Sequence, residues 1–366
     1  MVVLQVTSSS AQSGGVLQAI LLTRGLRERG HRVLFCGPAP SPALDAAARE
    51  GAETVALRFR TVGDLWRSSR ELRRLARSAG ADLVHAHHTK GHNVALLATF
   101  GGGFPPVIAN RGVLFRPEFP AKFRSRRTAA IITNSARVKT VLQESRVPGR
   151  KIHVVYNATE FGDLAETAEG ARALRRELDL EGASPVIGTV GSGKREKGFL
   201  YLVDAMPGIL RRFPEARFLL VGGYTEKFLP RIAELGLEER CRVTGFRADA
   251  RALMALMDVF VLPSIDMDSC PNVLLEAMAL GVPAVGTDVG GVAEILEEGR
   301  VGTLVRPGDP GELERAVCSL LERADGGKTL GRLGSERIAG GFTLERKTEE
   351  TLKVYRSVLG GARSDA

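Results

Sequence analysis

The sequence predicts an α/β protein built from two doubly wound parallel sheets. The length of 366 residues exceeds the size at which a single core stops growing, about 250 residues, so two domains are expected. Short β-branched runs alternate with amphipathic helical stretches along the chain, which is the pattern of βαβ units. Apolar residues at 44% and charged residues at 25% are typical of a globular protein with a sizeable core.

Six strands are expected in the first half of the chain, with helices between them. These strands cover residues 2–7, 32–36, 82–85, 107–109, 131–134 and 152–155. The first helix is expected over residues 16–29, entered through Ser13-Gly14-Gly15 and ended by Gly30 as a C-cap.

A second alternating series follows a change of texture after Asn157. The small, polar and acidic stretch 158–171 predicts a linker between domains. Six further strands are expected at residues 186–190, 217–221, 241–244, 259–263, 283–286 and 303–305. A final helix over residues 344–359 could pack on either domain.

Positive charge is concentrated in the first half. Residues 1–165 carry 24 Lys and Arg against 11 Asp and Glu, a net charge of +13, whereas the whole chain carries +9. The excess lies mainly in residues 67–77 and 111–127. Such a basic face attracts an anionic membrane surface, nucleic acid or a phosphate-bearing substrate, and charge alone does not choose among them.

The cellular setting is predicted from three absences in the sequence. No apolar run reaches the roughly 20 residues needed to cross a bilayer. The N-terminus has no basic region and no cleavage pattern, so it is interpreted as a first strand. The four cysteines form no Cys-x-x-Cys pair: Cys36, Cys241, Cys270 and Cys318. Reduced thiols and a cytoplasmic location are therefore expected.

A loop rich in glycine and cations follows the strand 186–190. In Gly191-Ser-Gly-Lys-Arg-Glu-Lys-Gly198 the glycines are expected to expose backbone N–H groups beside three cations. Anionic oxygen is the natural ligand of such a loop, with a solvated loop as the alternative. Glu196 occupies the third glycine position of the dinucleotide fingerprint, and no Walker A pattern is present.

The segment 263–283 gives the sharpest prediction. Pro271 suits the first position of a helix that Gly281 ends, and this helix would start where a parallel strand ends. The positive end of the helix suits a diphosphate. Asp268 before the helix and Glu276 about one and a half turns into it could bind hydroxyls of two sugars in one ligand. Asp266 and Asp268 also form a D-x-D pair, so a divalent metal is an alternative, as is a structural role for Glu276.

These residues resemble the signature of the retaining family 4 glycosyltransferases of the GT-B fold. The E-x7-E pattern of the family matches Asp268 and Glu276, with Asp in place of the first Glu. Other segments resemble the family in the same order: Gly245-Phe246, 258–264, 287–294, 155–157 and 342–359. The resemblance covers most of residues 155–359. It implies two Rossmann-like domains facing across a cleft: an acceptor-side domain of residues 1–160 plus 345–366, and a nucleotide-sugar-binding domain of residues 161–344.

The resemblance implies roles for residues of the second domain. Glu276 would hold the ribose hydroxyls, Asp268 the transferred sugar, and Lys197 the leaving diphosphate. The family usually has Arg where Ser192 stands, so Arg195 or Lys194 would supply the second cation. The remaining donor contacts would come from Gly191, Cys270, Pro271, Asn272 and Val273.

In the first domain, Gly14 and Gly15 resemble the glycine loop that lets the donor and the acceptor approach the backbone. His88 is expected to be catalytic on the acceptor side, with His87, Lys90, Asn110 and Arg111 as further acceptor-side residues. A packed histidine at a strand end is the alternative for His87 and His88, and an H-x-H metal site is a further alternative for the cluster 85–92. Ser135 is interpreted as a helix cap or an acceptor contact.

The implied activity is retaining, metal-independent sugar transfer. The donor would be a nucleotide diphosphate sugar, which is a co-substrate rather than a cofactor, and the acceptor a glycan or a lipid-linked molecule, as in polysaccharide or lipopolysaccharide synthesis. The basic first domain would face an anionic membrane surface, and no nucleic acid is expected. Two alternatives stay open: a nucleotide-sugar epimerase of the same fold, and a non-enzymatic nucleic-acid-binding protein, although aromatic residues make up only 5% of the chain.

Overall fold

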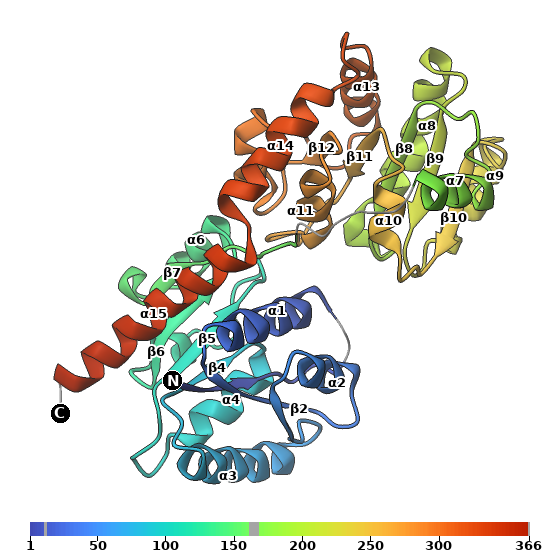
Figure 1. The fold of residues 1–366 in the computed structure, drawn as a ribbon. Helices are drawn as coiled ribbons and strands as arrows, with labels where there is room; N and C mark the ends of the chain where they lie inside the picture. Colours follow the sequence, from blue (N-terminus) through green and yellow to red (C-terminus); the bar gives the residue numbers. More distant parts are fainter. Residues whose placement is uncertain (11–12, 161–167, 365–366) are drawn as a thin grey trace. The chain divides into compact units, whose positions relative to one another are not determined.

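The chain divides into two compact units in the computed structural model, which describes residues 1–10, 13–160 and 168–364. The first unit comprises Met1–Ala158 with Leu344–Ala366, and the second comprises Thr159–Thr343. Each unit is built on one parallel sheet with helices on both faces (Figure 1). The predicted fold class is therefore confirmed. Residues 161–167 of the predicted linker lie outside the described residues.

The first unit contains a seven-stranded sheet in the order β3-β2-β1-β4-β5-β6-β7. The strands are β1 (Val2–Val6), β2 (Arg32–Gly37), β3 (Glu53–Ala56), β4 (Leu83–Ala86), β5 (Val107–Arg111), β6 (Thr128–Thr133) and β7 (Ile152–Val154). Strand β3 is missing from the predicted set. It pairs only with β2 at the edge of the sheet, and most of its short length is exposed, so it lacks the buried run by which a strand is recognised.

Neighbouring residues of β1 point into opposite helical layers, as the two-residue period of a strand requires. Leu4 and Val6 pack with helices α3 (Val62–Ser78) and α4 (Thr89–Ala98). Val3 instead packs with α1 (Gly14–Glu28) and α15 (Leu344–Ser364). The remaining helical segments are α2 (Pro42–Arg49), which packs on α1, and α5 (Ala121–Arg124), α6 (Ala136–Glu144) and η1 (Gly149–Lys151). The last helix of the chain therefore belongs to the core of the first unit.

The second unit contains a six-stranded sheet in the order β10-β9-β8-β11-β12-β13. The strands are β8 (Val186–Val190), β9 (Arg217–Val221), β10 (Cys241–Gly245), β11 (Val259–Leu262), β12 (Ala284–Thr287) and β13 (Thr303–Val305). One face packs on α8 (Phe199–Arg212), α9 (Leu229–Glu234) and α13 (Pro310–Leu321). The other helices are α7 (Ala168–Glu177), α10 (Ala250–Met254), α11 (Asn272–Ala279), α12 (Val292–Ile295) and α14 (Lys328–Gly341), with short turns η2 (Arg195–Lys197), η3 (Glu226–Phe228) and η4 (Glu297–Gly299).

Both sheets reverse their strand order at one position. Counted within each unit, the first strand lies between the second and the fourth, so the order changes direction between β1 and β4 and between β8 and β11. Open α/β sheets bind ligands outside the carboxyl ends of their strands at such a switch point. The loops that follow these four strands are therefore where a site is expected.

Two further observations bear on the chemistry of the chain. Across residues 1–10, 13–160 and 168–364, no helix combines the length and the apolar character that crossing a membrane requires. All four cysteines are free thiols in buried positions.

Candidate active site

An ion pair joins the two loops at the switch point of the second unit. Lys197 follows β8 and Asp268 follows β11, and their side chains are in direct contact although 71 residues separate them in sequence. The Asp268 side chain is 6% exposed and that of Lys197 is 28% exposed. The two residues predicted to serve the diphosphate and the transferred sugar thus bind each other in this structure.

Two buried hydroxyl groups orient the Asp268 carboxylate, and neither was predicted as a site residue. Ser264 donates its hydroxyl to Asp268, and Thr287 donates to the carbonyl oxygen of Ser264. Ser264 and Thr287 are both fully buried. Both residues lie in segments that resemble the family, but the sequence does not show that the Ser264 hydroxyl binds Asp268 or that the Thr287 hydroxyl holds the backbone of Ser264.

The glycines of the 191–198 loop do not leave their amides free, which corrects the prediction. The N–H of Gly191 donates to Val221 O at 2.9 Å, and that of Gly193 donates to Gly223 O at 2.7 Å. A Cβ atom on Gly193 would overlap the backbone of Tyr224, so close packing between loops requires this glycine. The loop contributes cations instead: Lys194 and Arg195 are exposed beside Lys197.

Helix α11 begins at Asn272, one residue later than predicted. Pro271 is its N-cap, with an extended ψ of 118°, and its carbonyl oxygen accepts the N–H of Leu274 at 3.2 Å. Cys270 and Pro271 are buried, whereas Asn272 and Val273 are half-buried in the first turn. This eight-residue helix therefore starts four residues beyond Asp268.

Glu276 lies within α11 with no hydrogen-bond donor to its carboxylate among the described residues. Burial raises the pKa of Glu276, and the positive charge of Arg251 partly opposes this shift. Arg251 itself donates to the carbonyl oxygen of Glu160, and its Nε is buried without a partner. Glu276 is half-buried. A carboxylate that is partly removed from water and lacks donors from its own protein is costly unless a ligand supplies them, and such groups gather at functional sites.

The two carboxylates of the D-x-D pair do not share a partner. Asp266 is exposed and accepts the N–H of Met267 at 2.7 Å, whereas Asp268 is buried against Lys197. Met267 has a φ of 68°, and this left-handed residue turns the chain between them. Within the part of the chain that the structure describes, no group of three or more His, Cys, Asp or Glu residues could hold a metal ion.

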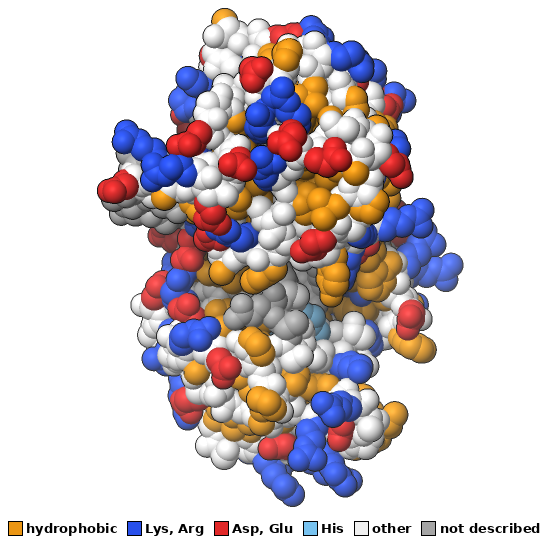
Figure 2. All heavy atoms as spheres, turned by 90° about the vertical axis from the view of Figure 1, so that its right-hand side faces the viewer, with side chains coloured by type: hydrophobic (Ala, Val, Ile, Leu, Met, Phe, Trp, Pro, Cys, Tyr) orange, Lys and Arg blue, Asp and Glu red, His pale blue; other side chains and the backbone are white. Residues whose placement is uncertain are grey.

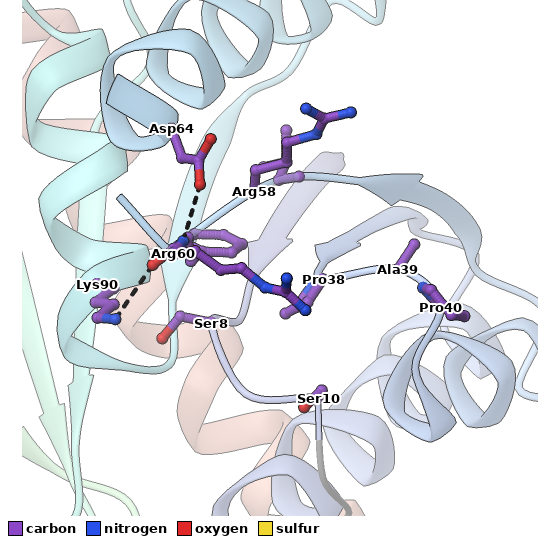
Figure 3. A pocket seen from close by; sticks show the side chains of 11 residues that line it. Ser8, Ser10, Pro38, Ala39, Pro40, Arg58, Arg60, Asp64 and Lys90 are labelled. Carbon is purple, nitrogen blue, oxygen red and sulfur yellow. Dashed lines mark hydrogen bonds between the residues drawn. The ribbon is translucent and has the colours of Figure 1, made fainter. Parts of the chain in front are cut away.

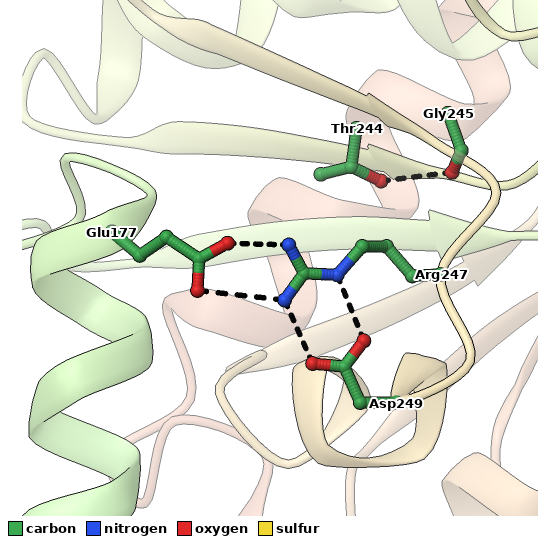
Figure 4. A network of polar contacts seen from close by, with 5 residues as sticks. All are labelled: Glu177, Thr244, Gly245, Arg247 and Asp249. Carbon is green, nitrogen blue, oxygen red and sulfur yellow. Dashed lines mark hydrogen bonds and ion pairs between the residues drawn. The ribbon is translucent and has the colours of Figure 1, made fainter.

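Arg247 anchors the loop that follows β10, a third loop at this edge of the sheet. Its guanidinium donates to both carboxylate oxygens of Asp249, at 2.8 and 2.7 Å, and pairs with Glu177 at the end of α7 (Figure 4). The hydrogen bonds from Arg247 lower the pKa of Asp249. Phe246, the preceding residue, is 81% exposed. This ion-pair network therefore gives an exposed aromatic ring a fixed base at the carboxyl end of β10.

His88 lies at the corresponding switch point of the first unit. Its Nδ1 is 2.8 Å from the hydroxyl oxygen of Thr7, so this contact joins the loops that follow β1 and β4. Gly14 and Gly15 belong to the first turn of α1 and not to a loop, which corrects the prediction. A Cβ atom on Gly15 would lie 3.5 Å from His88 Nε2. Burial lowers the pKa of His88, which favours the neutral imidazole.

The other predicted acceptor-side residues divide into interior and exposed positions. His87 is buried and its Nε2 is 2.6 Å from Gln5 Oε1, while Arg111 is buried with its guanidinium over the Phe115 and Phe123 rings. Lys90 is exposed, and its ammonium donates to Phe59 O at 3.1 Å.

Four other side chains of this region are half-buried or bonded to protein groups: Asn110, Ser135, His85 and His92. Asn110 is half-buried at the end of β5. Ser135 caps α6 by accepting the N–H of Val138 at 3.3 Å, which is the capping role that the sequence suggested. The other histidines of the 85–92 cluster also have protein partners: His85 Nδ1 is 2.7 Å from the Tyr355 hydroxyl, and His92 Nε2 is 2.9 Å from the Thr128 hydroxyl.

Two family models match the chain, one for each unit. The model for Glycosyltransferase Family 4 matches residues 13–161, and the model for Glycosyl transferases group 1 matches residues 184–323. The fold is that of a two-domain α/β protein, and each unit matches a glycosyltransferase family model. Residues 13–161 belong to Glycosyltransferase Family 4 and residues 184–323 to Glycosyl transferases group 1, so the resemblance found in the sequence is confirmed.

Curated relatives match over part of their length. A 2-deoxystreptamine glucosyltransferase from Streptomyces kanamyceticus is 32% identical over 65% of this chain and 63% of its own. A lipopolysaccharide core biosynthesis glycosyltransferase, LpsE, from Rhizobium meliloti is 30% identical over 57% of this chain and 58% of its own. The match thus spans less than two thirds of either relative.

Solved structures match over nearly the whole chain. Anabaena HepE in complex with UDP has a TM-score of 0.85 at 23% identity, covering 98% of this chain and 100% of HepE. A glycosyltransferase from Rickettsia africae has a TM-score of 0.89 at 19% identity, covering 98% of both chains. These likenesses establish the GT-B fold of the chain.

Proposed function

We propose that the chain is a retaining glycosyltransferase that moves a sugar from a nucleotide diphosphate sugar to a glycan or a lipid-linked acceptor. The observation that supports this most strongly is the meeting of Lys197 and Asp268 at the β8/β11 switch point, with Glu276 in the helix that follows. The structures of HepE in complex with UDP and with UDP-glucose support the same class of donor.

On the donor side, Lys197 would stabilise the diphosphate as its negative charge grows, with Arg195 or Lys194 nearby. Fixed cations aimed at developing charge lower a barrier because they need no reorganisation during the reaction. Both roles require the Lys197–Asp268 contact to open: a phosphate oxygen would replace the carboxylate at Lys197, and sugar hydroxyls would donate to Asp268. These protein cations could serve the diphosphate without a metal, so we propose a metal-independent reaction in which the nucleotide sugar is a co-substrate.

The nucleoside would be held by two features of the second unit. Glu276 would accept hydrogen bonds from the ribose hydroxyls, which supply the donors that its carboxylate lacks among the described residues. Phe246 would cover the base with its exposed ring. Cys270, Pro271, Asn272 and Val273 would line the sugar and phosphates at the start of α11, while Gly191 would act only through loop packing.

On the acceptor side, His88 is the residue best placed to contact a reacting hydroxyl. Its neutral imidazole lies beside Gly15 at the start of α1, and its Nδ1 is fixed by Thr7. The departing phosphate would help to deprotonate the acceptor, as expected for retention through front-face attack. His87 and Arg111 would stabilise the surrounding structure from their interior positions.

The first unit would also bind an anionic membrane surface through α3. Arg67, Arg70, Arg74 and Arg77 are exposed on this helix at spacings that place them along one face, and none forms an ion pair among the described residues. Trp66 is 49% exposed and Val62 is 72% exposed on the same helix. Lys and Arg side chains gather at the lower end of the view in Figure 2, the level at which α3 is drawn in Figure 1.

The proposed donor binding is tested by thermal shift against a panel of uridine, guanosine and adenosine diphosphate sugars. One of these should raise the melting temperature of the wild type, and Glu276→Ala should lose most of that rise because the ribose contact is gone. The control is Arg49→Gln, which changes an exposed residue of the first unit. No stabilisation of the wild type by any nucleotide sugar, or undiminished stabilisation of Glu276→Ala, would contradict the assignment.

A further inference from the structure

A polar pocket opens in the first unit at the carboxyl ends of three neighbouring strands. It has a volume of about 650 Å³, within the range of small-molecule sites. Ser8 and Ser10 follow β1, Pro38, Ala39 and Pro40 follow β2, and residues 57–60 follow β3 (Figure 3). Lys90, from the first turn of α4, completes one wall. None of the sequence predictions pointed to this pocket, apart from naming Lys90.

The segment that follows β3 alternates between buried apolar and exposed basic residues. Leu57 and Phe59 are 2% and 6% exposed in the core, while Arg58 and Arg60 are exposed. In extended backbone, alternate side chains point to opposite sides, so burial of the apolar pair holds both arginines outward. Figure 3 shows Arg60 reaching toward Pro38, whereas the Arg58 guanidinium points the other way.

The backbone of this segment is fixed by hydrogen bonds from three directions. The N–H of Leu57 donates to Gly37 O at 2.7 Å, and the Ser68 hydroxyl bonds both the N–H and the carbonyl of Arg58 at 2.9 Å. Lys90 donates to Phe59 O at 3.1 Å. The basic wall is therefore preorganised, which reduces the entropy lost when a ligand binds.

The charge of the pocket is predominantly positive. Its charged lining residues are Arg58, Arg60 and Lys90 against a single acid, Asp64. The Asp64 carboxylate accepts the N–H groups of Arg60 and Thr61, at 3.1 and 3.0 Å, as part of the cap of α3. Neither arginine side chain forms an ion pair among the described residues. An anionic group beside Arg60 would thus meet an unpaired guanidinium, and Arg58 would add positive charge at the wall.

Two residues that line the pocket are close in sequence to residues of the proposed acceptor side. Ser8 directly follows Thr7, whose hydroxyl bonds His88, and Lys90 lies two residues beyond His88. We infer that this pocket holds the part of the acceptor that does not react, and that this part carries a phosphate or a carboxylate group. Arg60 would bind the anionic group, Lys90 would lie between it and His88, and Ser8 and Ser10 would bind hydroxyls. The acceptor role rests on the proposed function, whereas anion binding does not.

The inference is tested by saturation-transfer NMR on the full chain with four matched probes: glucose 6-phosphate, glucuronate, glucose and glucosamine. Either anionic probe should bind more tightly than glucose, and glucosamine should bind most weakly. Arg60→Gln should weaken the anionic probe about tenfold, as expected for loss of one charge-assisted contact, while Arg49→Gln should not. A preference for the phosphate or the carboxylate probe identifies which group the acceptor carries.

Two outcomes would overturn the inference: equal binding of charged and neutral probes, or unchanged anion binding by Arg60→Gln in a folded protein. The nucleotide-sugar measurement separates this failure from failure of the proposed function. Glu276→Ala should lose nucleotide-sugar binding and retain the anionic probe, and Arg60→Gln should show the reverse. If the wild type binds the anionic probe through Arg60 but binds no nucleotide sugar, the acceptor role falls together with the proposed transferase activity.

Discussion

Glu276 is half-buried and has no hydrogen-bond donor to its carboxylate among the described residues, which affects stability. Its pKa is raised in the folded chain from an ordinary value of 4.5, so the native state holds its proton to higher pH than the unfolded state does. Between pH 4.5 and the raised pKa of folded Glu276, the native state binds more protons than the unfolded state, so the free energy of unfolding falls as pH rises. Above the raised pKa, the cost of keeping the Glu276 carboxylate ionised in the folded chain is fully present.

Replacing Glu276 with Gln should therefore stabilise the protein at neutral pH by a few degrees in melting temperature, while nucleotide-sugar binding is lost. The advantage should shrink as pH falls from neutrality through the raised pKa of Glu276 toward 4.5, and it should be absent below about 4.5, where the wild-type carboxyl is protonated in both states. Melting curves of both proteins across this range check the prediction. A constant difference at every pH would show that ionisation of Glu276 is not its source.

Asp268 restrains the cation that the diphosphate is proposed to use. In Asp268→Asn the amide is uncharged, so Lys197 should be freer to bind a phosphate. We expect affinity for a free nucleoside diphosphate to hold or rise several-fold, while transfer falls by about 100-fold or more because hydroxyl acceptance by the carboxylate is lost. Calorimetry and a transfer assay measure the two effects. A purely structural ion pair would instead give lower thermal stability and lower nucleotide affinity together.

The glycines at the starts of α1 and of the β8–α8 loop have different physical roles. A Cβ on Gly193 would overlap the Tyr224 backbone, whereas one on Gly15 would meet only His88 Nε2, at 3.5 Å. Gly193→Ala should therefore destabilise the chain by roughly 1–3 kcal/mol. Gly15→Ala should be neutral or stabilising by up to about 1 kcal/mol, because alanine favours the helix.

Urea unfolding of the two variants measures this difference. If Gly15→Ala also reduces transfer without loss of stability, close approach of a ligand at the start of α1 is supported. Equal stability of the two variants would contradict the packing argument.

The sequence predicted elements well where buried β-branched runs stand between turn residues. The strands Val186–Val190, Arg217–Val221 and Thr303–Val305 have the predicted bounds. β3 was not predicted because its side chains are mostly exposed at a sheet edge. The start of α11 was predicted one residue too early because Pro271 fits an extended cap as well as a first helical position. The glycine amides of the 191–198 loop were misread because a sequence does not show which neighbouring loop packs against them.

At the level of the site, the sequence could name Lys197, Asp268 and Glu276, since spacing and strand ends mark them. It could not show that Lys197 contacts Asp268, because side-chain contacts between separate loops depend on the fold. The interior positions of His87 and Arg111 were hidden for the same reason: a polar residue at a strand end can face the core or the ligand. The basic pocket at residues 57–60 was missed because its strand, β3, was missed.

Because positive charge is concentrated in the first unit, we expect the chain to bind anionic membranes through that unit. In part, the basic clusters are structural: Arg73 donates to the carbonyl oxygen of Ala98 at 3.1 Å, and Arg127 lies 3.8 Å from the centre of the Phe100 ring. The exposed face of α3 carries four further arginines. Replacing Arg67, Arg70, Arg74 and Arg77 with Gln should abolish flotation with anionic vesicles at low salt.

Flotation of the wild type should weaken with added salt, since about 0.1 M salt screens exposed charges beyond roughly 10 Å. Neutral vesicles should float neither protein. Equal flotation of the wild type with neutral and anionic vesicles would remove the membrane proposal, and it would leave the donor site unaffected.

The loops after β8 and β11, with the start of α11, are proposed to bind a nucleotide diphosphate sugar. Hydrogen–deuterium exchange on the full chain, with and without the nucleotide sugar that stabilises it best, tests this directly. Exchange should slow in residues 191–200 and 264–276 of the wild type and stay unchanged in Glu276→Ala at the same ligand concentration. If the nucleotide sugar binds but exchange does not slow in these two segments, the proposed placement of the donor site is wrong.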